Sequence, residues 1–125
     1  MDNNEKKERM MNAIRLWCIE QGLNEITDNE SYYYHTDIAF TKDNKITGFI
    51  FEFDKDDEQL MFKMVFSRSI CDYVYVVTDD SKKRKELSDK IMDEYGLLCY
   101  SNSFGLGYVY QVLKKPSLLQ KGLIR

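Results

Sequence analysis

The chain has 125 residues and a formal net charge of −3, and 43% of its residues are hydrophobic. This length and hydrophobic fraction predict one folded domain with a single core, not a disordered chain. A pI near 5.2 excludes a generally basic nucleic-acid binder but not local basic patches. The sequence has no apolar run of about eighteen residues, and its charged start lacks the apolar stretch of a signal peptide. We therefore expect a cytoplasmic protein without a membrane span.

The three cysteines, Cys18, Cys71 and Cys99, are odd in number and lie among apolar residues. Their spacing does not match that of metal ligands. The pattern predicts buried, unbridged thiols in a reducing compartment.

An amphipathic helix is predicted over residues 4–21, ending at Gly22. Its inward stripe consists of Met10, Ile14, Trp17, Cys18 and Gln21, and Glu20 falls away from it. A polar link over residues 24–30 leads to a strand that begins with three consecutive tyrosines, residues 32–34. Tyrosines can stack on nucleobases, but aromatic residues are also common strand formers, and both interpretations stay open.

A β-hairpin is predicted from two runs that alternate apolar and polar residues, 34–40 and 48–54. A two-residue loop at Asn44-Lys45 would place Asp37 directly opposite Glu52, with their Cβ atoms about 5 Å apart. Asp54 shares this face because side chains in a strand alternate with a period of two. The opposite, core-facing side is expected to carry Ile38, Phe40, Phe49, Phe51 and Phe53.

Facing carboxylates destabilise one another, and a hard divalent cation between them would reverse that effect. The hairpin therefore predicts a site for Mg²⁺ or Mn²⁺ at Asp37 and Glu52. The alternative is an acidic, solvated sheet face without a function.

The second half of the chain alternates helices and strands. Asp56-Asp57-Glu58 is expected to open a helix, since acidic residues are favourable at the helix N-terminus. Residues 71–78 form the most apolar run, which is typical of a central strand covered on both faces. A third helix is predicted over residues 82–95, ending at Gly96.

Two further strands are predicted over residues 97–101 and 107–113. The resulting order, α-β-β-α-β-α-β-β, indicates an α/β fold with a mixed central β-sheet flanked by helices. Residues 1–116 are expected to form a single domain, and residues 117–125 a loose, basic C-terminal tail.

This order, with acidic residues on the hairpin, resembles the PD-(D/E)XK nuclease superfamily and its restriction-endonuclease-like fold. In that family an Asp on one strand is followed by Glu-x-Lys on the next. Thr36-Asp37 matches the first part, and Glu52-Phe53 begins the second. Asp72-Tyr73-Val74-Tyr75-Val76-Val77 looks like the family's strand after the second helix, and Tyr95-Gly96-Leu97-Leu98 resembles its entry to the next strand. The likeness spans residues 32–116, and its motif is short.

The resemblance implies Mg²⁺-dependent hydrolysis of DNA phosphodiester bonds, with Asp37, Glu52 and the Phe53 carbonyl holding the metal. The chain departs from the family at Asp54, which stands where the motif has lysine. Asp54 itself, or Lys63 on the next helix, would then orient the attacking water. Lys55 is expected to point to the opposite face.

Three other features have both a functional and a structural interpretation. His35 shares the face of Asp37 in the predicted strand and could reach the site, although a lone strand histidine is more often structural. Glu20 could contribute a carboxylate, as in some family members, or be a solvated surface residue. The basic run of residues 82–85 could contact a phosphate backbone or form a solvated face.

A second hypothesis is a catalytically degraded nuclease-fold module, such as a phage or mobile-element regulator that binds another protein. The partners expected are accordingly DNA or a protein, without a membrane. A homodimer is also compatible with the sequence.

Overall fold

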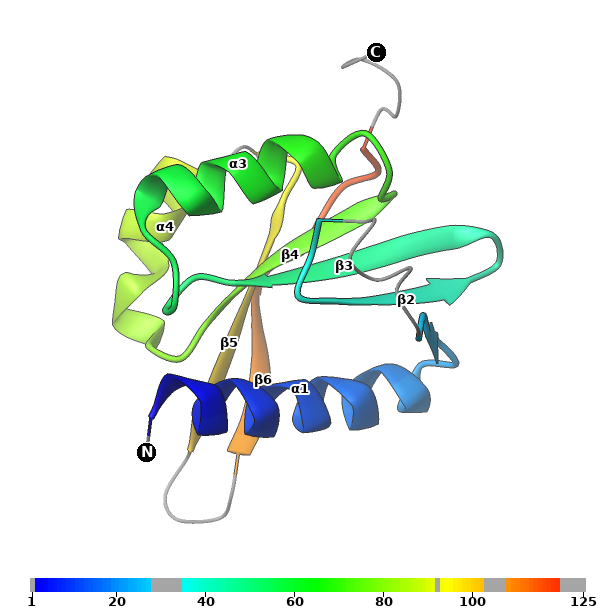
Figure 1. Ribbon diagram of the computed structural model, residues 1–125, viewed down its shortest axis with the longest axis horizontal. Coiled ribbons are helices and arrows are strands. Elements are labelled where there is room, and N and C mark those ends of the chain that lie inside the picture. The colour runs from blue at the N-terminus through cyan, green and yellow to red at the C-terminus, as the bar shows by residue number, and fades with distance from the viewer. Residues whose placement is uncertain (1, 28–34, 92, 103–107, 120–125) are drawn as a thin grey trace.

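A six-stranded mixed sheet lies between α1 on one face and α3 and α4 on the other (Figure 1). The computed structural model describes residues 2–27, 35–91, 93–102 and 108–119. The helices are α1 (Asn3–Glu20), α3 (Asp57–Ser67) and α4 (Arg84–Lys90), and a 3₁₀ turn, η1 (Ser81–Lys83), precedes α4. The strands are β1 (Asn24–Glu25), β2 (Ile38–Lys42), β3 (Lys45–Phe51), β4 (Tyr73–Thr78), β5 (Gly96–Asn102) and β6 (Tyr108–Lys114). The predicted α/β class is confirmed.

The strands are adjacent in sequence order, from β1 at one edge to β6 at the other. β3, β4 and β5 run parallel, and the remaining neighbours are antiparallel. Each parallel connection passes through a helix, as parallel strands require. Within the described residues, no helix has both the length and the hydropathy needed to cross a membrane.

The core has two layers, one on each face of the sheet. The layer under α1 contains Met10, Ile14, Cys18, Ile38, Phe40, Phe49, Phe51, Val77, Leu98 and Tyr100. The layer under α3 and α4 contains Ile50, Leu60, Met64, Cys71, Val74, Val76, Leu87, Ile91, Tyr95, Leu97 and Leu119. β4 therefore contributes to both layers, which confirms the prediction of a central strand covered on both faces.

The cysteines are buried and form no disulfide with one another. Burial, with a smaller contribution from the charge of Glu25, raises the pKa of the Cys18 thiol to about 12. Cys18 therefore stays protonated and behaves as a small apolar residue of the core.

The β2–β3 hairpin forms, but the predicted register is wrong by two residues. The turn is Asp43-Asn44, with φ angles of 53° and 64°, and Lys42 pairs with Lys45. Both residues tolerate this left-handed conformation, which suits the turn to the twist of a hairpin. In the observed register, Asp37 precedes β2 and Glu52 follows β3, so the two residues do not face each other across the hairpin. The Glu52 N–H instead donates to Val77 O.

Two boundaries also differ from the prediction. The supposed polar link contains β1, which pairs with β2. α4 ends at Lys90, because Ile91 turns into an extended conformation (ψ 151°) and its side chain is buried in the core. The predicted tyrosine-rich start of the first strand, residues 32–34, lies outside the described residues.

The tail predicted to be loose is held to the domain in its described part. Leu119 is 3% exposed, and its N–H donates to Asp72 O, while Ser117 N–H donates to Glu94 O. Residues 117–119 therefore pack with the domain, and residues 120–125 lie outside the described part of the chain.

Gly48 gives a test of the packing at the end of the hairpin. A Cβ at this position would lie 2.5 Å from Thr36 Cγ2 and 3.2 Å from Cys71 Sγ. Gly48→Ala is expected to lower the free energy of unfolding by roughly 1–3 kcal/mol through overpacking, measured by urea denaturation. Thr36→Ser removes the nearer obstructing methyl group, so the double variant should recover part of the loss. An undiminished loss in the double variant would contradict this explanation.

Candidate functional site

A cavity of about 450 Å³ is lined by residues of α1, α3 and the segments next to β2 and β3. Figure 1 shows the carboxyl end of β3 on the same side of the molecule as the amino-terminal ends of α1 and α3. Open α/β sheets bind ligands most often at the carboxyl ends of their parallel strands. The described residues that line the cavity are Lys7, Asp37, Asp54, Lys55, Asp56, Glu58, Gln59, Phe62 and Lys63. Three of the four site residues predicted from the sequence, Asp37, Asp54 and Lys63, are therefore brought together.

The carboxylate of Asp37 lies at the centre of these contacts, with a side chain only 4% exposed. Its Oδ2 accepts hydrogen bonds from Phe51 N–H and Lys55 Nζ, each at 2.8 Å. Its Oδ1 lies 2.9 Å from Lys7 Nζ and 3.9 Å from Lys63 Nζ. A buried carboxylate is stabilised only when such partners satisfy it, so Asp37 is a fixed anion that three lysines surround.

Lys55 points into the site, and the prediction that it faces the opposite side is wrong. Its Nζ lies 2.8 Å from Asp37 Oδ2, 2.8 Å from Asp54 Oδ1 and 2.9 Å from Phe51 O. The period-two alternation fails here because β3 ends at Phe51 and the chain turns, with Lys55 N–H donating to Glu52 O. Three oxygen atoms thus converge on one cationic group.

Glu52 belongs to a different network. Its side chain is 10% exposed; Oε1 accepts a hydrogen bond from Thr78 Oγ1 at 2.9 Å and lies 3.2 Å from Lys83 Nζ. Among the described residues, Glu52 is outside the lining of the Asp37 cavity. The predicted Asp37–Glu52 pair is therefore not formed; the carboxylate that shares lysines with Asp37 is Asp54, through Lys7 and Lys55.

The remaining candidates lie elsewhere. His35 has a φ angle of 57°, and its ring packs 5.3 Å from the Phe66 ring, outside the described cavity lining. Glu20 is exposed at the last residue of α1, far along the helix from Lys7. Of the basic run at residues 82–85, Lys83 pairs with Glu52.

Lys7 is the site residue that sequence reasoning missed. It lies three residues before Met10, so it extends the buried stripe of α1 toward the helix N-terminus. Extrapolating that stripe by one turn could have placed Lys7 against the sheet. Its contact with Asp37 still required the tertiary packing of α1 on the hairpin.

The lysines and carboxylates perturb one another. Burial alone would lower the pKa of Lys7, but attraction and hydrogen bonding to Asp37 and Asp54 raise it overall. Burial would raise the pKa of Asp54, yet Lys55 and Lys7 together lower it. Burial lowers the pKa of Lys63; attraction to Asp37 partly opposes this effect, and repulsion from Lys55 and Lys7 adds to it. Lys63 therefore loses its proton more readily than Lys7 does.

The arrangement is suited to binding a cation with oxygen ligands or a phosphate with ammonium groups. Within the described residues, no group of three or more His, Cys, Asp or Glu side chains is placed to hold a metal ion. The oxygen atoms that converge on Lys55 instead come from two carboxylates and one backbone carbonyl.

Comparisons of the chain with protein-family models, with curated proteins and with solved structures found no match.

Asp37→Asn is expected to destabilise the fold by roughly 3 kcal/mol, because Lys7 and Lys55 would lose their shared anion in a buried setting. Urea denaturation at neutral pH measures this loss. The matched control is Asp43→Asn in the exposed hairpin turn, which should change stability by less than about 0.5 kcal/mol. A stabilised Asp37→Asn variant would instead mean that repulsion between carboxylates dominates.

Asp54 should make stability depend on pH in a defined direction. Because its folded-state pKa lies below the ordinary value of 3.8, its ionised form stabilises the fold above that pH. This contribution is lost as the pH falls through the lowered pKa. The difference in unfolding free energy between the wild type and Asp54→Asn should therefore shrink below about pH 4. A difference that stays constant from neutral to acidic pH would contradict the assignment.

Proposed function

We propose that the chain is a divalent-metal-dependent nuclease related to the PD-(D/E)XK type, with Asp37 and Asp54 as its carboxylates and Lys55 as its lysine. Asp54 and Lys55 are adjacent, whereas the family motif has one residue between its acidic residue and its lysine, so this assignment departs from the motif spacing. The observation that supports this most is the convergence of Asp37 Oδ2, Asp54 Oδ1 and Phe51 O on one cationic position. The chain also contains, in order, the helix, hairpin, helix, strand, helix and strand on which the family resemblance rests, with β1 as an additional strand before the hairpin.

The donor set fits Mg²⁺ in its chemistry. Carboxylate and carbonyl oxygens are the hard ligands that this ion prefers, and it commonly uses one or two carboxylates with water and phosphate. The Lys55 ammonium now occupies the point where the three oxygens meet. A metal can bind there only if the flexible Lys55 side chain withdraws.

A bound Mg²⁺ would supply a water of lowered pKa and neutralise charge on the phosphate. Asp54 is the more exposed of the two carboxylates, with 22% of its side chain accessible, and would orient that water. Lys55, once displaced, and Lys63 would donate hydrogen bonds to phosphate oxygens. Asp37, which is almost fully buried, would hold both the ion and the surrounding lysines in place.

The charge of the cavity makes phosphate binding dependent on the metal. The described lining contains three lysines and four carboxylates, which give a formal charge of −1. A divalent cation would change the sign of this charge to +1. Nucleic acid is therefore expected to bind well only when a divalent metal is present.

The second candidate function, a non-catalytic module that binds a protein, draws on a different observation. Asp37 is already paired with Lys7 and Lys55, and Glu52 with Lys83, so both networks are electrostatically satisfied without an added ion. A regulator of a phage or mobile element could retain such networks for stability alone.

Cleavage of supercoiled plasmid, single-stranded DNA and RNA in Mg²⁺ or Mn²⁺ tests the nuclease proposal. The wild type should cleave at least one substrate, and Asp54→Asn or Lys55→Met should reduce the rate by about 100-fold or more. Glu52→Gln is the discriminating variant, since Glu52 lies outside the described cavity lining and should retain activity. Calorimetry with the same metals should show a rise in melting temperature that Asp54→Asn diminishes.

Cleavage that survives Asp54→Asn would indicate a different site or a contaminant. Loss of cleavage in Glu52→Gln would instead support Asp37 and Glu52 as the metal ligands, the assignment that the sequence predicts. If no substrate is cut and neither metal raises the melting temperature, the protein-binding function is the better account.

A further inference from the structure

A row of exposed aromatic rings runs along α3 beside the cavity. Phe62 and Phe66 are 54% and 42% exposed, and their ring centroids lie 4.3 Å apart at an interplanar angle of 36°. The His35 ring lies 5.3 Å from that of Phe66. Adjacent exposed aromatic rings form a larger apolar surface than scattered single residues, and such a surface often binds a ligand.

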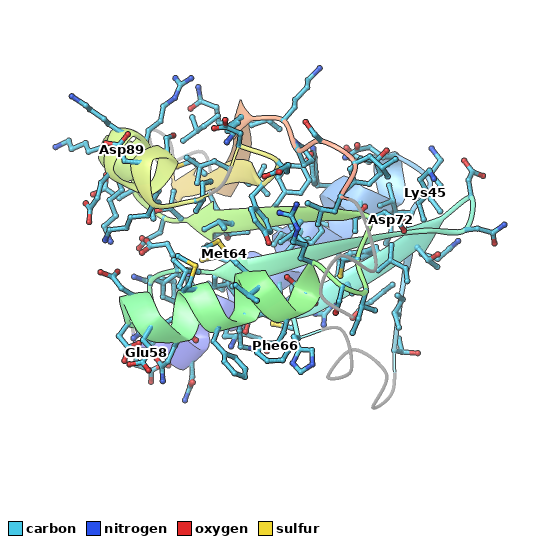
Figure 2. The ribbon with its side chains drawn as sticks, turned by 90° about the horizontal axis from the view of Figure 1, so that it is seen from above. Lys45, Glu58, Met64, Phe66, Asp72 and Asp89 are labelled. Carbon is cyan, nitrogen blue, oxygen red and sulfur yellow. The ribbon has the colours of Figure 1, made fainter. Side chains whose placement is uncertain are left out.

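Helix geometry connects this row to the charged site. Gln59, Phe62, Lys63 and Phe66 follow the spacing i, i+3, i+4, i+7, which places them on one stripe of α3. The buried residues Leu60, Met64 and Ser67 form the neighbouring stripe. Figure 2 shows Met64 on the side of α3 toward α4 and Phe66 on the side away from it.

Phe62 is the residue that links the two features. It lines the cavity together with Asp37 and Lys63, and its ring is also in contact with Phe66. One surface thus presents the Lys63 ammonium next to two partly exposed phenyl rings. The repeating unit of a single-stranded nucleic acid has the complementary pair of groups, a phosphate and a flat base.

We propose that Phe62, supported by the adjacent Phe66 ring, stacks on an unpaired nucleobase next to the phosphate at Lys63, so that this site takes single-stranded or locally unpaired nucleic acid. The inference rests on the proposed function and specifies its substrate class. Every base has a π-face, and exposed aromatic side chains bind it with little dependence on sequence. A base within a duplex has both faces covered by its neighbours, so a paired strand cannot make this contact.

The Lys63 ammonium favours a nucleotide over an apolar protein segment on this surface. A protein helix or strand laid on Phe62 would also cover Lys63, which is already half-buried with a lowered pKa. Covering that ammonium without an anion would cost further solvation. A phosphate placed there satisfies it instead.

Fluorescence anisotropy with labelled oligonucleotides tests the inference independently of cleavage. Single-stranded DNA, single-stranded RNA and a DNA duplex of equal length are titrated with protein in Ca²⁺, which replaces Mg²⁺ as the cation. We expect single strands to bind more tightly than the duplex. Phe62→Ala should weaken single-strand binding by about 5- to 100-fold and change duplex binding by less than about twofold.

Two variants control for loss of structure. Met61 is 43% exposed on the same helix and lies outside the described cavity lining, so Met61→Ala should bind like the wild type. Phe62→Trp keeps a ring at the same position and should retain the preference for single strands. Thermal unfolding confirms that each variant is folded before its binding is compared. Comparing single-stranded DNA with single-stranded RNA shows whether the sugar contributes to the binding affinity.

The possible results separate the base-stacking inference from the nuclease proposal. Equal weakening of single-strand and duplex binding by Phe62→Ala, or no binding of any oligonucleotide by the wild type, would overturn the inference. Phe62-dependent binding of single strands without cleavage in Mg²⁺ or Mn²⁺ would support it and reject the catalytic function. Cleavage with no effect of Phe62→Ala would reject the inference and leave the nuclease proposal in place.

Discussion

The buried carboxylate of Asp37 joins α1 to three consecutive segments of the chain: the end of β3, the turn that follows it and α3. It accepts a hydrogen bond from the last residue of β3, pairs with Lys7 of α1 and with Lys55 of the following turn, and lies near Lys63 of α3. A carboxylate with a side chain only 4% exposed carries a large desolvation cost, which these partners offset. Because each partner comes from a different element, the position of the anion depends on how α1, the hairpin and α3 pack together.

The sequence predicted correctly which hairpin residues face the core. It did not predict which residues pair with each other across the two strands. A slip of two residues preserves the alternation of side chains, so Ile38, Phe40, Phe49 and Phe51 still lie together under α1. The same slip removes the cross-strand partner expected for Asp37. The cause is local, since Asp43-Asn44 accommodates two positive φ angles better than Asn44-Lys45 would.

The composition of the site was harder to predict because it depends on where β3 ends and on contacts between distant elements. Alternation places Lys55 on the face opposite Asp37 only if the strand continues past Phe51. The alternating run of residues 48–54 gives no indication that the strand ends at Phe51. Lys7 reaches Asp37 through the packing of α1, a contact across about thirty residues of sequence. Asp54 was identified because it stands where the family motif has lysine, and Lys63 because it is a lysine on the following helix that could replace the missing one.

The same three oxygens that now surround Lys55 are those a metal ion would need, and this overlap has an energetic consequence. An ion that enters must displace an ammonium from two carboxylates and a carbonyl, which weakens metal binding in the absence of substrate. A phosphate nearby gives the displaced ammonium a new anionic partner and thereby offsets that cost. Under the proposed function, metal and nucleic acid therefore bind with positive coupling, each raising the affinity for the other by the same factor. The lysine would then keep the site closed to metal until a phosphate is present.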